Sequence, residues 1–311
     1  MEDFFFDKEL VPIVALKKIG KFFNSHHGAP YVFVAPFVLT FLVFFLYPLI
    51  NTIFMSFQEI VPGIVTFIGF KNYERLMNGA FYKALEVTAI FTFWSVLLLV
   101  FIPMILAVLI NSVIKVCKNF FKISVFIPAM VSTVVGGVIF RQIFGELDTS
   151  FMNSVLLKIG LPAQEWTMSA GTGMFLMVLL AVWRWMGVNM LYYLAGLQNI
   201  SHHLYESADI DGAGSFKKFI YITLPSLKPV TIFIMVISIS AGFKMFEESY
   251  VFWQGNSPMN IGLTIVGYLY KEGIAKGNMG LGSATGVILL LIIMTLSLIQ
   301  LKLFGLFDRE E

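Results

Sequence analysis

Residues 84–111 read ALEVTAIFTFWSVLLLVFIPMILAVLIN, and this stretch carries one charged side chain, Glu86. At about 1.5 Å of rise per residue, a helix of this length exceeds the ~30 Å hydrocarbon core of a bilayer. A helix also satisfies its own peptide hydrogen bonds, which lipid cannot do. The stretch is therefore expected to be a membrane-spanning helix.

Five further apolar runs of comparable length surround it, so we expect an all-α, polytopic membrane protein with about six transmembrane helices. The six expected spans are 31–57, 84–111, 121–143, 172–197, 229–252 and 281–304. The runs are continuously apolar and lack the alternation of a transmembrane barrel strand. The first run is too long for a signal peptide, and no small-residue cleavage site follows it.

Composition supports the same conclusion. The chain has 311 residues, of which 58% are hydrophobic and 13% charged, and its mean hydropathy is +0.84. A soluble protein of this size could not bury so much apolar surface without aggregating. The composition therefore argues against a soluble enzyme, a DNA-binding module and a disordered regulator.

Lysine and arginine set the expected orientation. With the N-terminus inside, the segments 1–30, 112–122, 198–228 and 300–311 are cytoplasmic and carry twelve of these residues. The outer segments 58–83, 141–171 and 253–280 carry seven, and the other two lie within spans. We therefore expect a multi-pass protein of the bacterial cell (inner) membrane with both termini in the cytoplasm.

Residues 1–30 form a separate expected region, ahead of a transmembrane domain at 31–311. Apolar residues there alternate with Lys8, Lys17, Lys18 and Lys21, which indicates an amphipathic helix on the inner leaflet. A poorly ordered tail is the alternative.

No metal site is expected. Cys117 is the single cysteine, and the histidines occur as two adjacent pairs. Neighbouring side chains diverge by about 100° on a helix, so each pair is a poor chelate.

The cytoplasmic segment 198–228 has the punctuation of two short helices around a turn. Ser201 and Ser215 are candidate N-caps, and Gly212 permits the positive φ that ends the first helix. Pro225 is expected to stop the second helix before the membrane. Such an ordered segment is expected to dock on another protein.

This segment resembles the signature loop of ABC importer permeases. The matching residues are Glu206-Ser207-Ala208, Gly212 after three intervening residues, Ile222, and Leu224-Pro225, with Ser207 in place of the usual alanine. Asp211-Gly212-Ala213 and Thr223-Leu224-Pro225 resemble the carbohydrate branch, in particular the first permease subunit of maltose-type and multiple-sugar systems. Residues 140–146, 183–187, 245–251 and 260–264 are similar to those of arabino-oligosaccharide permeases.

The resemblance implies a type I importer fold and a coupling function for residues 201–225, which would sit in a cleft of a cytoplasmic ATPase. The implied ATPase-coupling residues are Glu206, Ser207, Ala208, Asp211, Gly212, Ala213 and Pro225. This chain is then not an enzyme and holds no cofactor, because it lacks a phosphate-binding Gly-x-x-x-x-Gly-Lys-Ser/Thr loop and the partner ATPase binds ATP and Mg²⁺. The implied partners are a second permease, two ATPase subunits, an extracellular or periplasmic sugar-binding protein, the oligosaccharide and membrane lipid, with no nucleic acid.

Polar and aromatic side chains within spans are candidates for the sugar path. These candidates are Trp183, Arg184, Asn189, Tyr192, Lys244, Glu247, Glu248 and Tyr250. Two alternatives stay open: Lys244 can neutralise Glu247 and Glu248 on one helix face, and Arg184 can bridge to either glutamate across helices. Trp183 and Trp185 point to different sides of their helix, so at most one faces the path.

The outer segments 144–171 and 253–280 are expected to contain a short helix near 149–159 and a turn at 255–258. In the family such segments meet the binding protein, and simple loops are the alternative. The intramembrane charges also leave open a proton-coupled secondary transporter, although the repeated halves typical of that class are absent.

Overall fold

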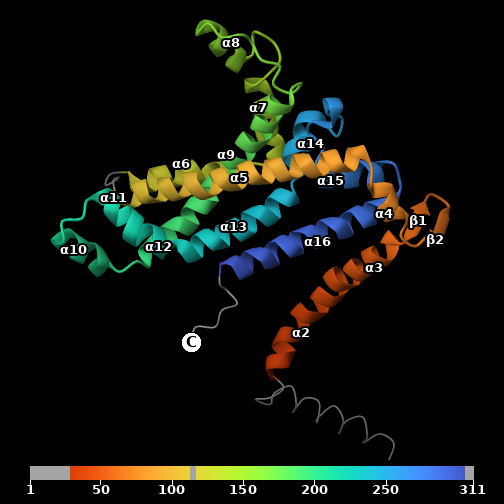
Figure 1. Cartoon of the computed structure of the whole chain (residues 1–311), viewed down its shortest axis with the longest axis horizontal. Coiled ribbons are helices and arrows are strands. Elements are labelled where there is room, and N and C mark those ends of the chain that lie inside the picture. The colour runs from red at the N-terminus through yellow and green to blue at the C-terminus, as the bar shows by residue number, and fades with distance from the viewer. Residues whose placement is uncertain (1–28, 113–116, 305–311) are drawn as a thin grey trace, which may run out of the picture. The chain divides into compact units, whose positions relative to one another are not determined.

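The computed structural model describes residues 29–112 and 117–304 (Figure 1). The expected amphipathic helix of the N-terminal segment lies outside these residues. The chain divides into two compact units at 55/56. The described part of the first unit contains α2 (Ala29–Phe41), a π-helical turn (Leu42–Leu46) and α3 (Tyr47–Ser56), which runs to the boundary.

The second unit is helical apart from one hairpin. Its elements are β1 (Gln58–Val61), β2 (Ile64–Phe67), α4 (Lys71–Leu76), α5 (Gly79–Ser112), α6 (Lys118–Met130), α7 (Thr133–Ile143), α8 (Phe151–Lys158), α9 (Ala170–Gln198), α10 (His202–Ile210), α11 (Ser215–Lys218), η2 (Phe219–Thr223), α12 (Leu224–Ser226), α13 (Lys228–Phe243), α14 (Glu247–Trp253), η3 (Pro258–Asn260), α15 (Ile265–Leu269), η4 (Tyr270–Ala275) and α16 (Met279–Leu303). The predicted helix near 149–159 and the turn at 255–258 are confirmed.

Within the described residues, five stretches are long and apolar enough to cross a membrane as helices, and a sixth is broken. The five are Pro30–Ser56, Gly79–Asn111, Ala170–Gln198, Lys228–Trp253 and Met279–Leu303. The predicted span 121–143 is not one straight helix, because α6 and α7 meet at an angle of 100°. Val131 and Ser132 have extended backbone at the bend. Pro128 lies just before them and, because it has no backbone N–H, removes a hydrogen bond from the last turns of α6.

The predicted span 229–252 is also interrupted. The α13 helix ends at Phe243, and Lys244, Met245 and Phe246 lie outside regular helix before α14 begins at Glu247. Hydropathy assigns these three residues to a helix, but the break places their side chains on a short non-helical segment.

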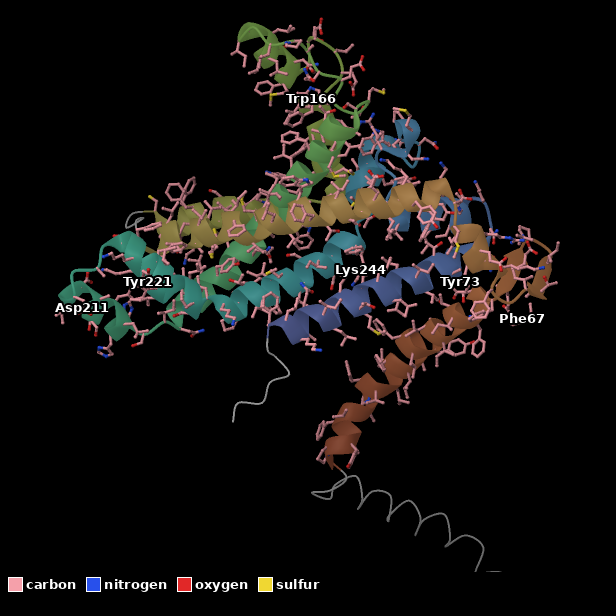
Figure 2. All side chains as sticks on the ribbon, viewed as in Figure 1. Phe67, Tyr73, Trp166, Asp211, Tyr221 and Lys244 are labelled. Carbon is pink, nitrogen blue, oxygen red and sulfur yellow. The ribbon has the colours of Figure 1, made fainter. Side chains whose placement is uncertain are left out.

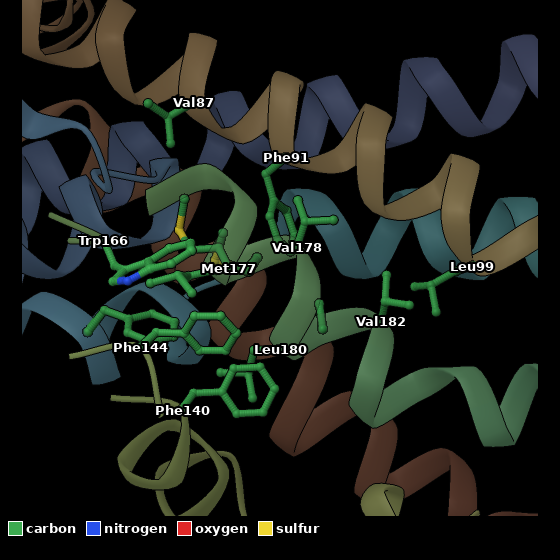
Figure 3. Close-up of a cluster of buried hydrophobic side chains, with 14 residues drawn as sticks. Val87, Phe91, Leu99, Phe140, Phe144, Trp166, Met177, Val178, Leu180 and Val182 are labelled. Carbon is green, nitrogen blue, oxygen red and sulfur yellow. The ribbon is translucent and has the colours of Figure 1, made fainter. Parts of the chain in front are cut away.

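The core of the second unit forms where α9 packs against α5, α6 and α13 (Figure 1). One buried cluster joins Val87 and Phe91 of α5 to Leu176 and Leu180 of α9 and to Phe140 of α7 (Figure 3). Gly187 of α9 lies against the backbone of Val125 and Phe126 in α6. These contacts fix α9 as the central element from which the candidate site is built.

Candidate translocation cavity and coupling loop

A cavity of about 580 Å³ lies between α5, α9, α13 and the α13–α14 break. Its lining combines apolar side chains of α5 and α13 with polar and aromatic side chains of α9 and the break. The lining residues are Phe91, Ser95, Leu99, Ala181, Arg184, Trp185, Val188, Asn189, Tyr192, Ile237, Ser238, Ala241, Gly242, Lys244, Met245, Phe246, Glu247 and Glu248. The cavity therefore has the mixture of apolar wall and few polar groups found in small-ligand sites.

Six of the eight predicted path residues line this cavity. They are Arg184, Asn189, Tyr192, Lys244, Glu247 and Glu248. The α9 helix presents the first three on one side, and the break and the start of α14 present the others. Lys244 lies at the end of α13 (Figure 2).

Trp183 and Tyr250 lie outside the cavity lining. The Trp183 ring packs 5.5 Å from the Phe140 ring, between α9 and α7. The Tyr250 ring is 5.0 Å from Phe246 and 5.7 Å from Tyr270. Trp185 lines the cavity instead of Trp183. Because side chains two residues apart diverge by about 200° around a helix, only one of these two tryptophans reaches it.

An ion pair crosses between α9 and α14 at the cavity wall. Arg184 Nη1 is 3.6 Å from Glu247 Oε2, which confirms the alternative that Arg184 bridges to a glutamate across helices. Lys244 makes no ion pair with another described residue, so the alternative of mutual neutralisation on one helix face is wrong. Its physical basis fails because the α13–α14 break separates Lys244 from the helix that carries the glutamates.

Thr133 completes this cluster and was missed from the sequence. Its buried hydroxyl accepts a hydrogen bond from Arg184 Nη1 and donates one of 2.5 Å to Glu247 Oε2. The cluster thereby joins α7, α9 and α14. The sequence did carry a signal, because Ser132 and Thr133 are adjacent polar residues in an apolar run shortly after Pro128.

A second polar contact links α9 to α5 at the cavity. Asn189 is buried and its Nδ2 donates to the backbone oxygen of Leu99 at 3.1 Å. The Arg184 guanidinium also lies 5.3 Å from the centre of the Trp185 ring, within cation–π distance. These contacts hold the polar side chains of α9 in defined positions.

The segment 198–228, called the coupling loop below after its predicted role, contains the two predicted helices α10 and α11. Gly212 has φ +71°. Its N–H donates to Asp209 O, and Ala213 N–H donates to Ala208 O. These two bonds form the Schellman motif that ends α10, in which glycine is favoured because the left-handed conformation strains other residues.

Two details of the predicted loop are wrong. Ser215 is the first residue of α11 and Gly214 occupies the N-cap position. Pro225 does not stop the helical path, which continues through η2 and α12 to Leu227. The π-helical turn η2 directly precedes α12, in which Pro225 is the second residue. Ser201 is at the N-cap of α10, but its side chain makes no capping bond.

The coupling loop is fixed to the bundle on one side and open on the other. Tyr205, Phe219 and Ile222 pack against the buried cluster that contains Met190 and Leu194 of α9. Within the loop, Tyr205 OH lies 2.8 Å from Thr223 Oγ1, and Lys218 pairs with Asp209. The predicted Glu206, Ser207, Asp211, Gly212 and Pro225 are exposed, whereas Ala208 and Ala213 are half-buried. Ile210, Phe216 and Tyr221 are also exposed, and Figure 2 shows Asp211 and Tyr221 at this end of the second unit.

The segment between α7 and α9 folds around one buried amide. The Asn153 Oδ1 atom accepts from Gln164 N at 3.0 Å and from Trp166 Nε1 at 2.8 Å. Asn153 Nδ2 donates to carbonyl oxygens, including that of Gly145 at 3.2 Å. Trp253 Nε1 of α14 donates to Thr167 O at 2.8 Å, so this segment is joined to the helix that carries Glu247.

Comparisons with known proteins agree on one family. Residues 113–310 match the family described as binding-protein-dependent transport system inner membrane component. The chain is 58% identical to the arabinooligosaccharides transport system permease protein AraP of Bacillus subtilis, over 93% of this chain and 92% of that protein. It is 50% identical to AraP of Halalkalibacterium halodurans, over 98% and 97% of the two chains.

A solved structure has the same fold. A bacterial ABC transporter involved in the import of the acidic polysaccharide alginate contains a chain that matches with a TM-score of 0.81 at 23% identity. The match covers 95% of this chain and 99% of that one. The predicted polytopic, all-α fold of an importer permease is thereby confirmed.

Proposed function

The chain belongs to the family of binding-protein-dependent transport inner membrane components, and from this membership we propose that it imports arabino-oligosaccharides. It is a permease subunit of an ABC importer and a non-enzymatic membrane component. The proposed substrate rests on one observation: the chain is 50–58% identical to arabino-oligosaccharide permeases over more than nine-tenths of its length. Two permeases of this kind form one path, so a second permease supplies the other half.

The proposed energy source is a pair of cytoplasmic ATPase subunits that bind ATP and Mg²⁺, and an external binding protein delivers the sugar. This arrangement fits the predicted orientation, in which both termini and the coupling loop are cytoplasmic. The lysine and arginine distribution supports that orientation. The outer segment around Asn153 is then on the side from which the binding protein approaches.

The cavity is the proposed sugar-contact site of this subunit. Its volume of about 580 Å³ falls in the roughly 300–1,000 Å³ range of small-ligand sites. Trp185 offers an aromatic face to the C–H surface of a sugar, and Asn189 and Lys244 offer polar groups to its hydroxyls. Arg184 and Glu247 are already paired, so their proposed contribution is to fix the cavity wall as well as to line it.

The coupling loop is the proposed contact with the ATPase. Its exposed face combines the carboxylate of Glu206 with the apolar side chains of Ile210 and Phe216, which lack cover in the described chain. Its other face packs against the helices through Tyr205, Phe219 and Ile222. A loop that is rigid on one side and apolar on the other suits transmission of movement from a docked partner.

The test is uptake of labelled arabinotriose into proteoliposomes that contain this chain with its co-purified partner subunits and binding protein. Uptake that needs internal ATP and continues without a proton gradient is expected. Uptake driven by the gradient after removal of the ATPase would instead establish the proton-coupled alternative. Maltotriose is the matched substrate control, because it has the same chain length with hexose units.

A paired substitution tests the coupling contact. Glu206→Arg reverses an exposed charge on α10 and is expected to abolish co-purification of the ATPase while the chain stays inserted. Glu165→Arg makes the same charge change at an exposed position of the outer segment and is expected to retain the ATPase. Equal ATPase recovery from the two variants would show that Glu206 makes no such contact.

A further inference from the structure

The hairpin of β1 and β2 is held to the helices along one strand only. Asn72 Nδ2 donates to Ser56 O at 3.0 Å and to Gln58 O at 2.8 Å. Gly280, in the first turn of α16, lies directly against Gln58 O, where a side chain would not fit. β1 is therefore pinned to the start of α16 by α4 and by backbone contact.

All four residues of β2 are exposed: Val65 and Phe67 form an apolar face, and Thr66 lies beside Ile64 on the other face. β2 pairs antiparallel with β1, and the two strands make a sheet of two. Val65 and Phe67 lie on one face with exposed fractions of 68% and 78%, and Ile64 lies on the other with 51%. A strand so placed exposes its apolar side chains and its unpaired backbone edge together, an arrangement that water disfavours.

The position of the hairpin relative to the membrane follows from the spans. The first candidate span ends at Ser56 and the second begins at Gly79, so residues 57–78 connect two span ends at one membrane surface. The span formed by α16 begins at Met279, and its first turn touches β1. A strand of four residues spans only about 13 Å, so β2 stays within about that distance of the span ends.

Aromatic side chains gather at the same place. The rings of Phe57, Phe70 and Tyr73 lie 5.3–5.9 Å from one another, and Phe70 is 69% exposed. Figure 2 shows Phe67 and Tyr73 at this end of the second unit. Aromatic residues are enriched at the headgroup level of membranes, where an apolar ring meets a polar boundary.

We propose that β2, together with Phe70, lies in the headgroup and acyl boundary of the bilayer and anchors this end of the chain to lipid. A protein partner is disfavoured because the face of β2 formed by Val65 and Phe67 carries no charged or hydrogen-bonding side chain of that strand. Thr66 lies on the other face, directly opposite Glu59 of β1, which forms a 3.0 Å ion pair with Arg75. The inference rests on the spans and not on the identity of the transported sugar.

Spin labels provide the test, because the chain has one cysteine. In a Cys117→Ser background, Val65→Cys, Phe67→Cys and Glu74→Cys each carry a nitroxide in the full-length chain. The chain is reconstituted with its co-purified subunits in phosphatidylcholine nanodiscs. Collision rates with dissolved oxygen and with a water-soluble nickel complex are then compared at each position. Glu74 is the matched control, because it is exposed on α4 in the same connecting segment.

Labels at Val65 and Phe67 are expected to collide with oxygen several-fold more often than with the nickel complex, and the ratio is expected to reverse at Glu74. Frequent collisions of all three labels with nickel would place β2 in water and overturn the proposal. Immobile labels at Val65 and Phe67 that are shielded from both reagents would place β2 against a protein and also overturn it.

Discussion

Gly187→Ala tests the central helix contact on which the cavity depends. A Cβ atom at Gly187 would stand 2.7 Å from Phe126 Cα, whereas ordinary contact begins at 3.4 Å, and it would come closer still to Val125 O. Both atoms belong to the α6 backbone and cannot rotate away. Overpacking of this kind costs about 1–3 kcal/mol, and alanine recovers only about 0.5–1 kcal/mol of helix propensity over glycine. The clash therefore dominates, and a net loss of stability is expected.

The matched control is Gly171→Ala in the same helix, where no atom lies within 4 Å of the added methyl group. Thermal unfolding of the purified chain in detergent is followed by tryptophan fluorescence at one scan rate, because unfolding of membrane proteins is commonly irreversible. Gly187→Ala is expected to melt several degrees below wild type, and Gly171→Ala at or above it. A Gly187→Ala midpoint equal to that of the control would refute the close approach of α6 and α9.

Three further outcomes are expected. Thr133→Val removes the hydroxyl between Arg184 and Glu247 and should cost roughly 1–3 kcal/mol in the same melting assay, whereas Thr133→Ser keeps the hydroxyl and should melt near wild type; similar midpoints would exclude the bridge. Trp185→Ala should raise the KM for arabinotriose uptake while Trp183→Ala leaves it unchanged, and equal KM values would contradict the assignment of the cavity. Gly212→Trp should lose the ATPase on purification, whereas Gly212→Ala, strained by only about 1 kcal/mol, should keep it; retention by both would show that the turn lies outside the contact.

Hydropathy predicts the long helices because their cause is local. The expected span 172–197 corresponds to Ala170–Gln198, and 281–304 corresponds to Met279–Leu303. Each is a continuous apolar run. In lipid, its peptide groups can form hydrogen bonds only with other peptide groups of the same helix. Turn chemistry is equally local, and Gly212 adopts the predicted positive φ.

The breaks within the spans 121–143 and 229–252 were harder to predict, because hydropathy averaged over a window of residues does not reveal a short interruption of the helix. Pro128 marks the bend between α6 and α7, but a proline also occurs within the continuous α5 helix at Pro103. The α13–α14 break at 244–246 contains neither proline nor glycine. It coincides with the contact of Glu247 with Arg184, so its cause is tertiary and is not visible in the local sequence.

The hairpin was missed although its signal is present. Pro62-Gly63 separates two short runs rich in isoleucine and valine, and Gly63 has φ +83°. Such a dipeptide between apolar runs favours a turn. Both runs lie in the expected outer segment 58–83, and each forms only four residues of strand.

The coupling loop and the cavity, which sequence reasoning treats separately, lie at the two ends of one helix. α13 begins at Lys228, directly after the coupling loop, and ends at Phe243, one residue before Lys244 enters the cavity lining. Its inner end is held by buried Leu227 and by Thr231, whose Oγ1 is 3.3 Å from Tyr193 OH. A helix of 16 residues spans about 24 Å and moves as a unit, whereas the non-helical segment after it can bend. A displacement of the coupling loop is therefore expected to reach the cavity at Lys244 and Glu247, where the ion pair with Arg184 must either move with the break or separate.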